Sequence, residues 1–451
     1  MTSPTVQRSQ EHEDICAACR STLITGVLLP DKRQVNLWYD ETGIIRAIDE
    51  TCAHPDRYDA DIILDGSGYI AMPGLINTHT HAAMTLFRGY ADDMHLQEWL
   101  SEKIWPLEAH LTAEHVYWGT KLACLEMIRS GTVAFNDMYF FMKDVARAVA
   151  ESGIRAMLSH GIITFGDDDK LEGELKATED LVHHVRSLNN PLITVAIGPH
   201  APYTVPVQHL ETCAGYSEQE KIGLHIHLAE TKQEVDECQK TYGMTPAALL
   251  DKAGCLTERT VVAHGCWLTE DDCQLLGERK VSVAHNPVSN MKLATGRAMP
   301  YHWLGRHGVN VCLGTDGCSS NNNLDMLEEM KVAAICQKFF WNSDTALPAG
   351  EALYMATSAG ARALGYHGGE IQVGMPADIV LLSRSHPSMV PLYNPVSNIT
   401  YAALGSAVAT VICQGKILMH NGYIPGEEQI VAGAAKAAED LLSRAGVGIV
   451  Q

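Results

Sequence analysis

Eight short apolar runs alternate with longer amphipathic stretches between about residue 70 and residue 320. The first run is YIAMPGLINTHTH and the last is VNVCLGTDG; between them lie GTVAFNDM, GIRAMLSHGII, ITVAIGPHA, KIGLHIHLAE, TVVAHGCWL and VSVAHNPVSN. Residues 112–130 are typical of the intervening stretches, because their apolar positions recur at helical spacing. Eight buried parallel strands with helices between them describe a (β/α)8 barrel. A doubly wound sheet has the same alternation, so the periodicity alone leaves both folds open.

The two ends of the chain have a different texture. Residues 21–70 contain short strand-like pieces separated by turn residues, and residues 371–423 repeat that pattern. Residues 426–446 are rich in alanine and helical in pattern. We therefore predict three parts: a barrel over 73–370, and a small composite β-sandwich built from residues 1–72 and 371–451, the latter with a terminal helix.

Composition and charge narrow the function classes. The 451 residues exceed the roughly 250 at which one core stops growing, as expected for a large and a small domain. A net charge of −21 without a long Lys/Arg run would repel nucleic-acid polymers and anionic membranes. No run of about 18 apolar residues predicts a membrane span, and MTSPTVQRSQEHED shows no secretory signal. The 13 scattered cysteines are typical of reduced thiols, so we expect a cytoplasmic protein.

Histidine and aspartate residues stand where the apolar runs end. His79 and His81 form an H-x-H, and side chains two apart in a strand point to the same face. One such pair is weak evidence in a chain with 21 histidines, but four other runs end in a further ligand-type residue: His200, His227, His264 and Asp316. In a barrel these positions share the C-terminal rim, where active sites are built. Imidazoles and a carboxylate suit Zn²⁺, with Fe²⁺ as a competitor.

Glu230 follows His227 by three residues, in H-L-A-E. That offset places its carboxylate just beyond the strand, where it can reach a substrate without binding the metal. A solvated glutamate at the start of a helix is the alternative, and the spacing does not separate the two.

Four motifs resemble those of the amidohydrolase superfamily: P-G-L-I-N-T-H-T-H (73–81), H-L-A-E (227–230), V-A-H-G (262–265) and G-T-D-G-C-S-S-N-N-N-L-D-M (314–326). D-D-x-x-L-x-E-W-L (92–100), followed by W-P-L-E (105–108), narrows the resemblance to the methylthioadenosine/S-adenosylhomocysteine deaminases. The likeness runs from about residue 60 to residue 420. From this resemblance and the alternation of strands and helices, we predict an α/β protein whose (β/α)8 barrel is a metal-dependent catalytic domain.

The resemblance implies one divalent metal held by four residues: His79, His81, His227 and Asp316. The fourth run, I-T-V-A-I-G-P-H, has no lysine for a bridging carbamate, which favours one metal over two. The implied reaction replaces the 6-amino group of an adenosine-like nucleoside and releases ammonia. In that reaction Asp316 would take and return the proton of the attacking water. Glu230 would protonate the ring nitrogen, and His264 would bind the attacking oxygen.

Substrate contacts are also implied by the resemblance. Glu108 would bind the two ribose hydroxyls, because a carboxylate can accept both hydrogen bonds; a surface glutamate is the alternative. His200 would contact the nucleoside, and Ser320 would lie toward its 5′ side. Trp105 would form one wall of the substrate pocket; the alternative is that it is an ordinary core residue.

One departure from the family pattern bears on the substrate. Members that accept S-adenosylhomocysteine place arginines after the third strand, where they pair with the amino-acid carboxylate. Here residues 159–175 read SHGIITFGDDDKLEGEL, and His160 stands at the first arginine position as a candidate contact. A guanidinium clamp is therefore absent. We expect methylthioadenosine, adenosine or 5′-deoxyadenosine to be preferred over S-adenosylhomocysteine.

Two other functions stay open. Guanine deamination and hydrolysis of a triazine substituent are reactions that use nearly the same metal site. Glu108 and the segment 97–108 are the reason to rank a small-molecule nucleoside first among the possible substrates. A non-catalytic scaffold usually loses metal ligands, whereas every ligand position is intact here. Relatives are often dimers or tetramers, so a homo-oligomer is expected by analogy.

Overall fold

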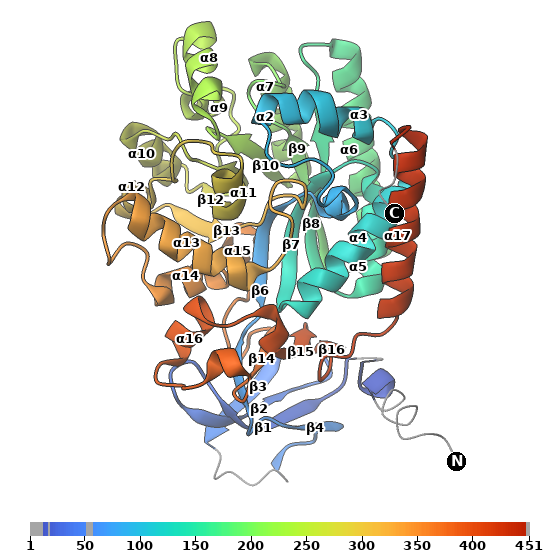
Figure 1. The fold of residues 1–451 in the computed structure, drawn as a ribbon, viewed down its shortest axis with the longest axis vertical. Helices are drawn as coiled ribbons and strands as arrows, with labels where there is room; N and C mark the ends of the chain where they lie inside the picture. The colour runs from blue at the N-terminus through green and yellow to red at the C-terminus, as the bar shows by residue number, and fades with distance from the viewer. Residues whose placement is uncertain (1–11, 17–18, 51–56, 448–451) are drawn as a thin grey trace.

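The computed structural model describes residues 12–16, 19–50 and 57–447 (Figure 1). The segment MTSPTVQRSQEHED, in which no secretory signal is visible, covers residues 1–14. Residues 1–11 of it lie outside the described residues. All eight apolar runs form strands, each parallel to its neighbour and paired in chain order: β6 (Leu75–Thr80), β7 (Thr132–Tyr139), β8 (Arg155–Ile162), β9 (Ile193–Pro199), β10 (Gly223–Leu228), β11 (Thr260–His264), β12 (Ser282–His285) and β13 (Asn310–Leu313).

The first and last of these strands meet. Thr78 Oγ1 donates a hydrogen bond to the carbonyl of Leu313 at 2.8 Å, and the amide of Asp316 donates to the carbonyl of His79 at 2.9 Å. Because an open doubly wound sheet has no such contact between its edges, the barrel prediction is confirmed and the doubly wound alternative is wrong.

Helices surround the strands: α4 (Ala113–Arg129), α5 (Met142–Ser152), α6 (Asp168–Leu188), α7 (Val207–Glu220), α8 (Lys232–Tyr242), α9 (Pro246–Lys252), α10 (Glu270–Glu278), α11 (Pro287–Lys292), α12 (Tyr301–Arg306), α13 (Met326–Phe340), α14 (Ala349–Met355) and α15 (Ser358–Ala363). Their starts follow from local chemistry. Thr112, Asp167, Thr231 and Thr269 precede four of them, and each side chain accepts a hydrogen bond from a first-turn amide.

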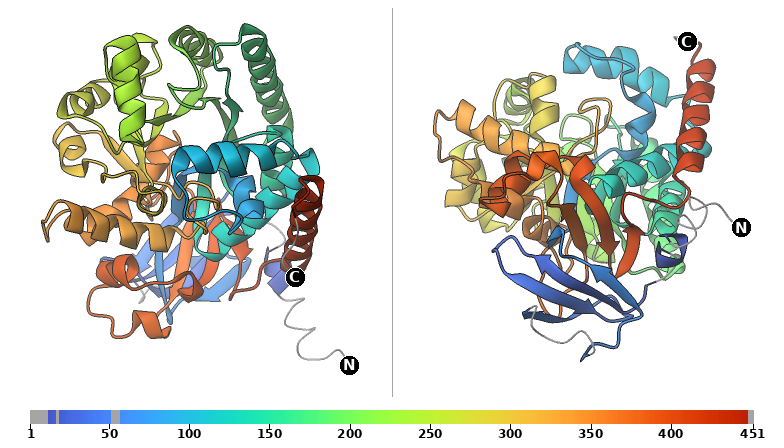
Figure 2. Two further views of the ribbon diagram at one scale, coloured as in Figure 1. Left: turned by 45° about the horizontal axis from the view of Figure 1, so that its top comes forward. Right: turned by 60° about the horizontal axis from the view of Figure 1, so that its bottom comes forward.

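Both ends of the chain build a second sheet (Figure 2, right). Its strands are β1 (Thr22–Leu28), β2 (Gln34–Tyr39), β3 (Ile45–Glu50), β4 (Ile62–Asp65), β5 (Tyr69–Pro73), β14 (Ile379–Ser383), β15 (Val408–Cys413) and β16 (Lys416–Met419). Antiparallel pairing of β5 with β14 joins the two ends. Strand β1 has an irregular register between Ile24 and Val27, pairs with β4 along its first half and touches β5 at Leu28. The strands are therefore one continuous sheet with an apolar core of its own, as expected for a unit composed from both termini.

The C-terminal helix returns to the barrel. Helix α17 (Glu427–Arg444) runs along α4, and Asp440 Oδ2 lies 2.8 Å from His115 Nε2. Gly433 permits this close approach, because a Cβ atom there would lie 2.4 Å from ring carbons of Trp118. None of the helices within the described ranges combines the length and the apolar character needed to cross a lipid bilayer.

A short segment lies across the C-terminal end of the barrel (Figure 2, left). It follows η2 (Ala82–Phe87) and consists of α2 (Leu96–Trp99), one π-helical turn η3 (Leu100–Ile104) and α3 (Trp105–Glu108). The remaining elements, η4 (Pro387–Met389), α16 (Pro395–Tyr401) and η5 (Gly405–Ala407), lie between β14 and β15.

Candidate active site

Four predicted ligand residues converge at the C-terminal end of the barrel. Nε2 of His81 and Nε2 of His227 are 3.3 Å apart. Asp316 Oδ1 lies 3.5 Å from His79 Nε2 and 3.3 Å from His81 Nε2. His79 is fully buried, and its Nε2 has no hydrogen-bond partner among the described residues. An unpaired buried ring nitrogen is costly unless something binds it, and three imidazoles with one carboxylate suit a divalent metal. The arrangement fits one such ion.

Each of these histidines is oriented through its other ring nitrogen. The Nδ1 partners are His225 Nε2 for His79 at 2.8 Å, the Met138 carbonyl for His81 at 2.7 Å and the His200 carbonyl for His227 at 2.6 Å. A carbonyl only accepts, so Nδ1 of His81 and of His227 carries the proton and Nε2 presents its lone pair to the centre. Burial lowers the pKa of His79 to about 4 and that of His227 well below its usual range, which keeps both rings neutral at pH 7.

Glu230 lies just beyond β10, with Oε2 3.9 Å from His264 Nε2. It is 7% exposed, so the solvated alternative is wrong. The buried carboxylate of Glu234, in the first turn of α8, accepts hydrogen bonds from the amides of Ala229 and Glu230, each at 2.8 Å. Ala229 has φ +49°, a left-handed conformation rare outside glycine, and these two bonds maintain it. Burial raises the pKa of Glu230 above its ordinary value.

Helix α11 anchors two further residues of the site. Ser289 Oγ donates to Asp316 Oδ2 at 2.7 Å, and Asn290 Oδ1 lies 2.8 Å from His264 Nδ1. The backbones of His264 and Asp316 are both left-handed, with φ +75° and +64°. Ring atoms of His79 and His264 and a carboxylate oxygen of Asp316 all lie within 4.8 Å of one another, so His264 borders the same centre. Two strained turns therefore aim two polar side chains at one point.

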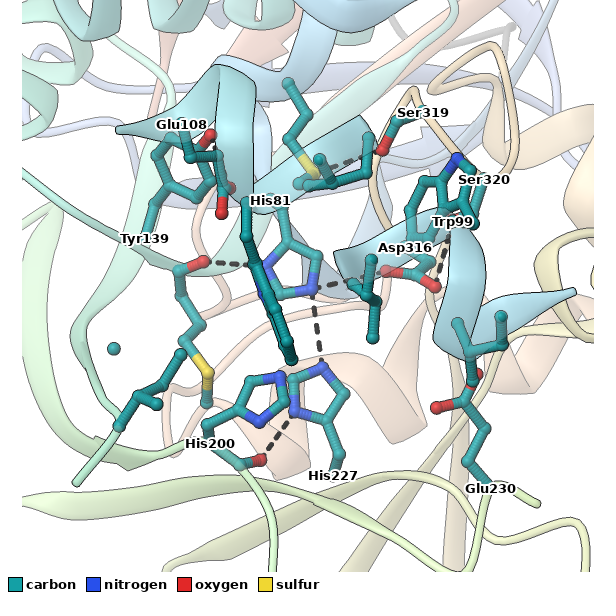
Figure 3. A pocket seen from close by; sticks show the side chains of 18 of the residues that line it. His81, Trp99, Glu108, Tyr139, His200, His227, Glu230, Asp316, Ser319 and Ser320 are labelled. Atoms are coloured by element: carbon teal, nitrogen blue, oxygen red, sulfur yellow. Dashed lines mark hydrogen bonds and ion pairs between the residues drawn. The ribbon is translucent and has the colours of Figure 1, made fainter. Parts of the chain in front are cut away.

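The site opens into a cavity of about 730 Å³, counting its mouth, within the roughly 300–1,000 Å³ typical of small-molecule sites. Trp105, Glu108, His200 and Ser320, the four residues predicted to contact the substrate, all line it. Glu108 accepts a hydrogen bond from Tyr139 Oη at 2.9 Å, and burial of its carboxyl group raises the Glu108 pKa to about 7. In Figure 3 Glu108 and Glu230 lie on opposite sides of the histidine cluster.

His160 is the predicted contact that the structure does not bring to the cavity. Its neighbours in β8 and beyond, Gly161 and Ile163, line the cavity, whereas the His160 side chain points to the other face. There it pairs with the carboxylate of Glu174 on α6 and packs against Phe140. The physical reason is the two-residue period of a strand, which turns adjacent side chains to opposite faces.

Sequence reasoning missed four positioning residues of the site, among them Ser289, which donates to Asp316. His225, which holds His79, stands two residues before His227, and the H-x-H period was a usable signal for it. Glu234 and Asn290 lie on helices that follow the strands, at offsets that no pattern in the sequence singles out.

Comparisons with known proteins agree with this geometry. The model of the amidohydrolase family matches residues 70–418. A 5′-deoxyadenosine deaminase of Methanospirillum hungatei is 79% identical over 437 residues, 97% of each chain. A 5-methylthioadenosine/S-adenosylhomocysteine deaminase of Archaeoglobus fulgidus is 48% identical over 84% of this chain and 89% of its own. The crystal structure of an adenosine deaminase from Xanthomonas campestris with bound zinc has a TM-score of 0.88 at 36% identity, covering 94% of this chain and 99% of that one.

Proposed function

This chain belongs to the amidohydrolase family, and we propose that it hydrolyses 5′-deoxyadenosine and related adenosine nucleosides to the inosine analogue and ammonia. The observation that carries the proposal is a buried glutamate, Glu230, set beside the ligand cluster, with a second buried carboxyl group, Glu108, across the same cavity. One carboxyl group suits proton transfer to a purine ring, and the other suits a ribose diol.

The proposed metal is Zn²⁺, held by His79, His81, His227 and Asp316. Three neutral nitrogen ligands and one carboxylate fit zinc, and the zinc-bound relative from Xanthomonas supports that choice over Fe²⁺. When bound, such an ion lowers the pKa of a coordinated water from about 16 to about 7, which supplies a nucleophile at neutral pH.

The protein residues then move the protons. Asp316 accepts a proton from the attacking water while Glu230, in its acid form, donates a proton to N1 of the purine. Burial raises the pKa of Glu230, which favours that form. Protonation of N1 makes C6 electrophilic, and the water oxygen adds there. His264, whose Nδ1–H faces the acceptor Asn290 Oδ1, donates a hydrogen bond to that oxygen from Nε2 in its protonated form as the charge develops. Asp316 returns its proton to the amino group, the C6–N bond breaks, and ammonia leaves. The C6 hydroxyl then gives up its remaining proton to become the carbonyl, and that proton restores the acid form of Glu230.

The 5′ preference follows from the walls of the cavity. Glu108 on the ribose hydroxyls would direct the 5′ end toward the apolar residues carried by the same segment and its neighbours: Leu96, Trp99, Leu100, Ile104, Trp105, Phe140 and Ile163. Within the described part of the chain, no lysine or arginine lines this cavity. A methyl or methylthio group fits such a wall, whereas an amino-acid carboxylate would be desolvated without a cation.

A substrate panel tests the function. We expect kcat/KM for 5′-deoxyadenosine, methylthioadenosine and adenosine to exceed that for S-adenosylhomocysteine by about 10- to 100-fold, because an unmade charge-assisted hydrogen bond costs about 1.5–3 kcal/mol. Ammonia release from the zinc-loaded enzyme is the measurement, with guanine and a triazine included. Faster turnover of guanine or the triazine would reject the nucleoside proposal. A preference for S-adenosylhomocysteine would reject the 5′ assignment alone.

The ionisation of Glu108 predicts a pH effect specific to the ribose. The carboxylate form accepts both hydroxyl protons, and burial places the Glu108 pKa at about 7, so the carboxylate is lost as pH falls through 7. The ratio of kcat/KM for adenosine to that for 2′,3′-dideoxyadenosine should therefore rise about tenfold between pH 6 and pH 8. The ratio cancels every ionisation that the two substrates share.

Glu108→Gln is the matched variant for that experiment. A glutamine cannot ionise, so the ratio should become independent of pH and stay low. A pH-dependent ratio that persists in the variant would place the titrating group elsewhere.

We also propose that the enzyme works in the cytoplasm. Each cysteine that the structure describes is free, and most are buried, which fits a reducing compartment.

A further inference from the structure

A buried carboxylate on α13, Glu329, takes no part in the chemistry described above. The residue is 1% exposed. Its Oε1 accepts a hydrogen bond from the amide of Val288 at 3.0 Å, and its Oε2 accepts one from Asn321 Nδ2 at 2.8 Å. Burial of a carboxylate is unfavourable unless its contacts compensate for the lost hydration. The two donors lie in separate segments at the C-terminal end of the barrel, so Glu329 joins those segments.

Val288 lies in the first turn of α11, a helix of six residues. The two residues that follow Val288 hold the side chains of Asp316 and His264. The first amides of a helix have no partner within that helix, and Asn286, the residue before α11, makes no capping hydrogen bond with its side chain. Glu329 supplies the acceptor from a neighbouring helix, and this contact fixes the start of α11.

Asn321 belongs to the loop that follows β13. The same Nδ2 that contacts Glu329 also donates a hydrogen bond to the carbonyl of Thr315 at 2.7 Å. Thr315 precedes Asp316, whose backbone is left-handed, with φ +64°. A residue other than glycine keeps such a conformation only where its surroundings hold it. Glu329 therefore orients the side chain that secures the turn at Asp316.

We propose that Glu329 is a positioning residue for the deamination. It holds α11 and the turn at Asp316 in a fixed relation, so that Asp316 and His264 point at the same centre. The inference rests on the proposed function, which assigns proton transfer to one of these residues and binding of the attacking oxygen to the other. The buried carboxylate of Glu234 has an equivalent place, because it accepts two amide hydrogen bonds from the turn that carries Glu230. Glu329 does for Asp316 what Glu234 does for Glu230.

This role predicts an effect on turnover rather than on substrate binding. Glu108 and Trp105 are proposed to bind the nucleoside, and among the described residues neither is hydrogen-bonded to Glu329 or to its two partners. A displaced Glu329 contact should therefore disturb the reacting groups and leave the ribose and 5′ contacts in place.

Glu329→Gln tests this division. Glutamine keeps the shape of the side chain but has an NH2 group in place of one acceptor oxygen, so one of the two hydrogen bonds is lost. We expect kcat for 5′-deoxyadenosine to fall about 10-fold, because catalysis is sensitive to small displacements of the reacting groups. KM should stay within about twofold, and the metal content of the same preparation should be unchanged. Glu328→Gln is the matched control, since Glu328 is the neighbouring residue on α13 and is exposed.

A double-mutant cycle separates positioning from a general loss of folded protein. Ser289→Ala removes the hydroxyl that donates to Asp316 Oδ2, which is one of the contacts through which Glu329 acts. If each single variant loses about tenfold in kcat, the double variant should lose clearly less than the roughly 100-fold product, because coupled sites are not additive. Independent effects would multiply.

Several results would overturn the role of Glu329: a multiplicative loss in the cycle, an unchanged kcat in Glu329→Gln, a loss of metal, or a rise in KM as large as the fall in kcat. Asn321→Ala breaks one of the same hydrogen bonds from the loop side and should show the same fall in kcat at constant KM, which keeps the test decisive if Glu329→Gln does not fold. Wild-type protein that deaminates no nucleoside would instead reject the proposed function.

Discussion

Replacing Glu230 with glutamine is expected to lower kcat for 5′-deoxyadenosine by about 10²- to 10⁴-fold while the protein keeps its metal. Glutamine has the same shape and retains the main-chain contacts with Glu234, but it has no proton to give to N1. The ligand atoms of His79, His81, His227 and Asp316 are untouched by the change. Single-turnover kinetics and metal analysis of the same preparation separate the two effects.

The matched control is Glu237→Gln, on the exposed side of α8, the helix that follows Glu230. It makes the same Glu-to-Gln change outside the cavity and should leave kcat unchanged. An unchanged kcat in Glu230→Gln would show that Glu230 transfers no proton in the reaction. A loss of metal in that variant would show instead that Glu230 supports the metal site.

Replacing His227 with alanine should abolish both metal retention and turnover. The change removes Nε2, which lies 3.3 Å from His81 Nε2 in the ligand cluster. Loss of a residue that merely orients a ligand weakens metal binding by roughly 10- to 100-fold, and loss of the ligand itself should exceed that. Metal content after dialysis is the primary readout. The melting temperature supports it, since a protein that binds no metal also loses the stabilisation that binding provides.

Two further histidine variants give an intermediate and a null effect on metal binding, with which His227→Ala is compared. His225→Ala removes the partner of His79 Nδ1 and should weaken metal binding by roughly 10- to 100-fold without abolishing it. His183→Ala removes a histidine whose side chain is 69% exposed on α6 and should have no effect. Full metal content in His227→Ala would reject the ligand set.

The strands and most of the site are predictable from residue type and spacing. Buried strands are apolar along their whole length, so the eight runs stand out. Polar residues that end such runs, including His264 and Asp316, are unfavourable in a core and therefore point to a rim. Trp105 and Glu108 are found only through the family resemblance, because a single glutamate in a short helix carries no local signal.

The sequence by itself determined the chemistry that the ligand cluster offers. Residue type and place at the strand ends identified six candidate ligands, and the family resemblance implied four of them: His79, His81, His227 and Asp316. Tertiary structure alone decided three things. It closed the barrel through contacts between β6 and β13, 235 residues apart for Thr78 and Leu313. It placed β8 in the barrel and so decided which face the strand period gives to His160, the face on which Glu174 lies. It also brought Glu234 beneath Glu230, where two amide hydrogen bonds hold the turn. The reason is common to all three: a side chain's direction and its distant partners depend on packing, which residue type and spacing do not encode.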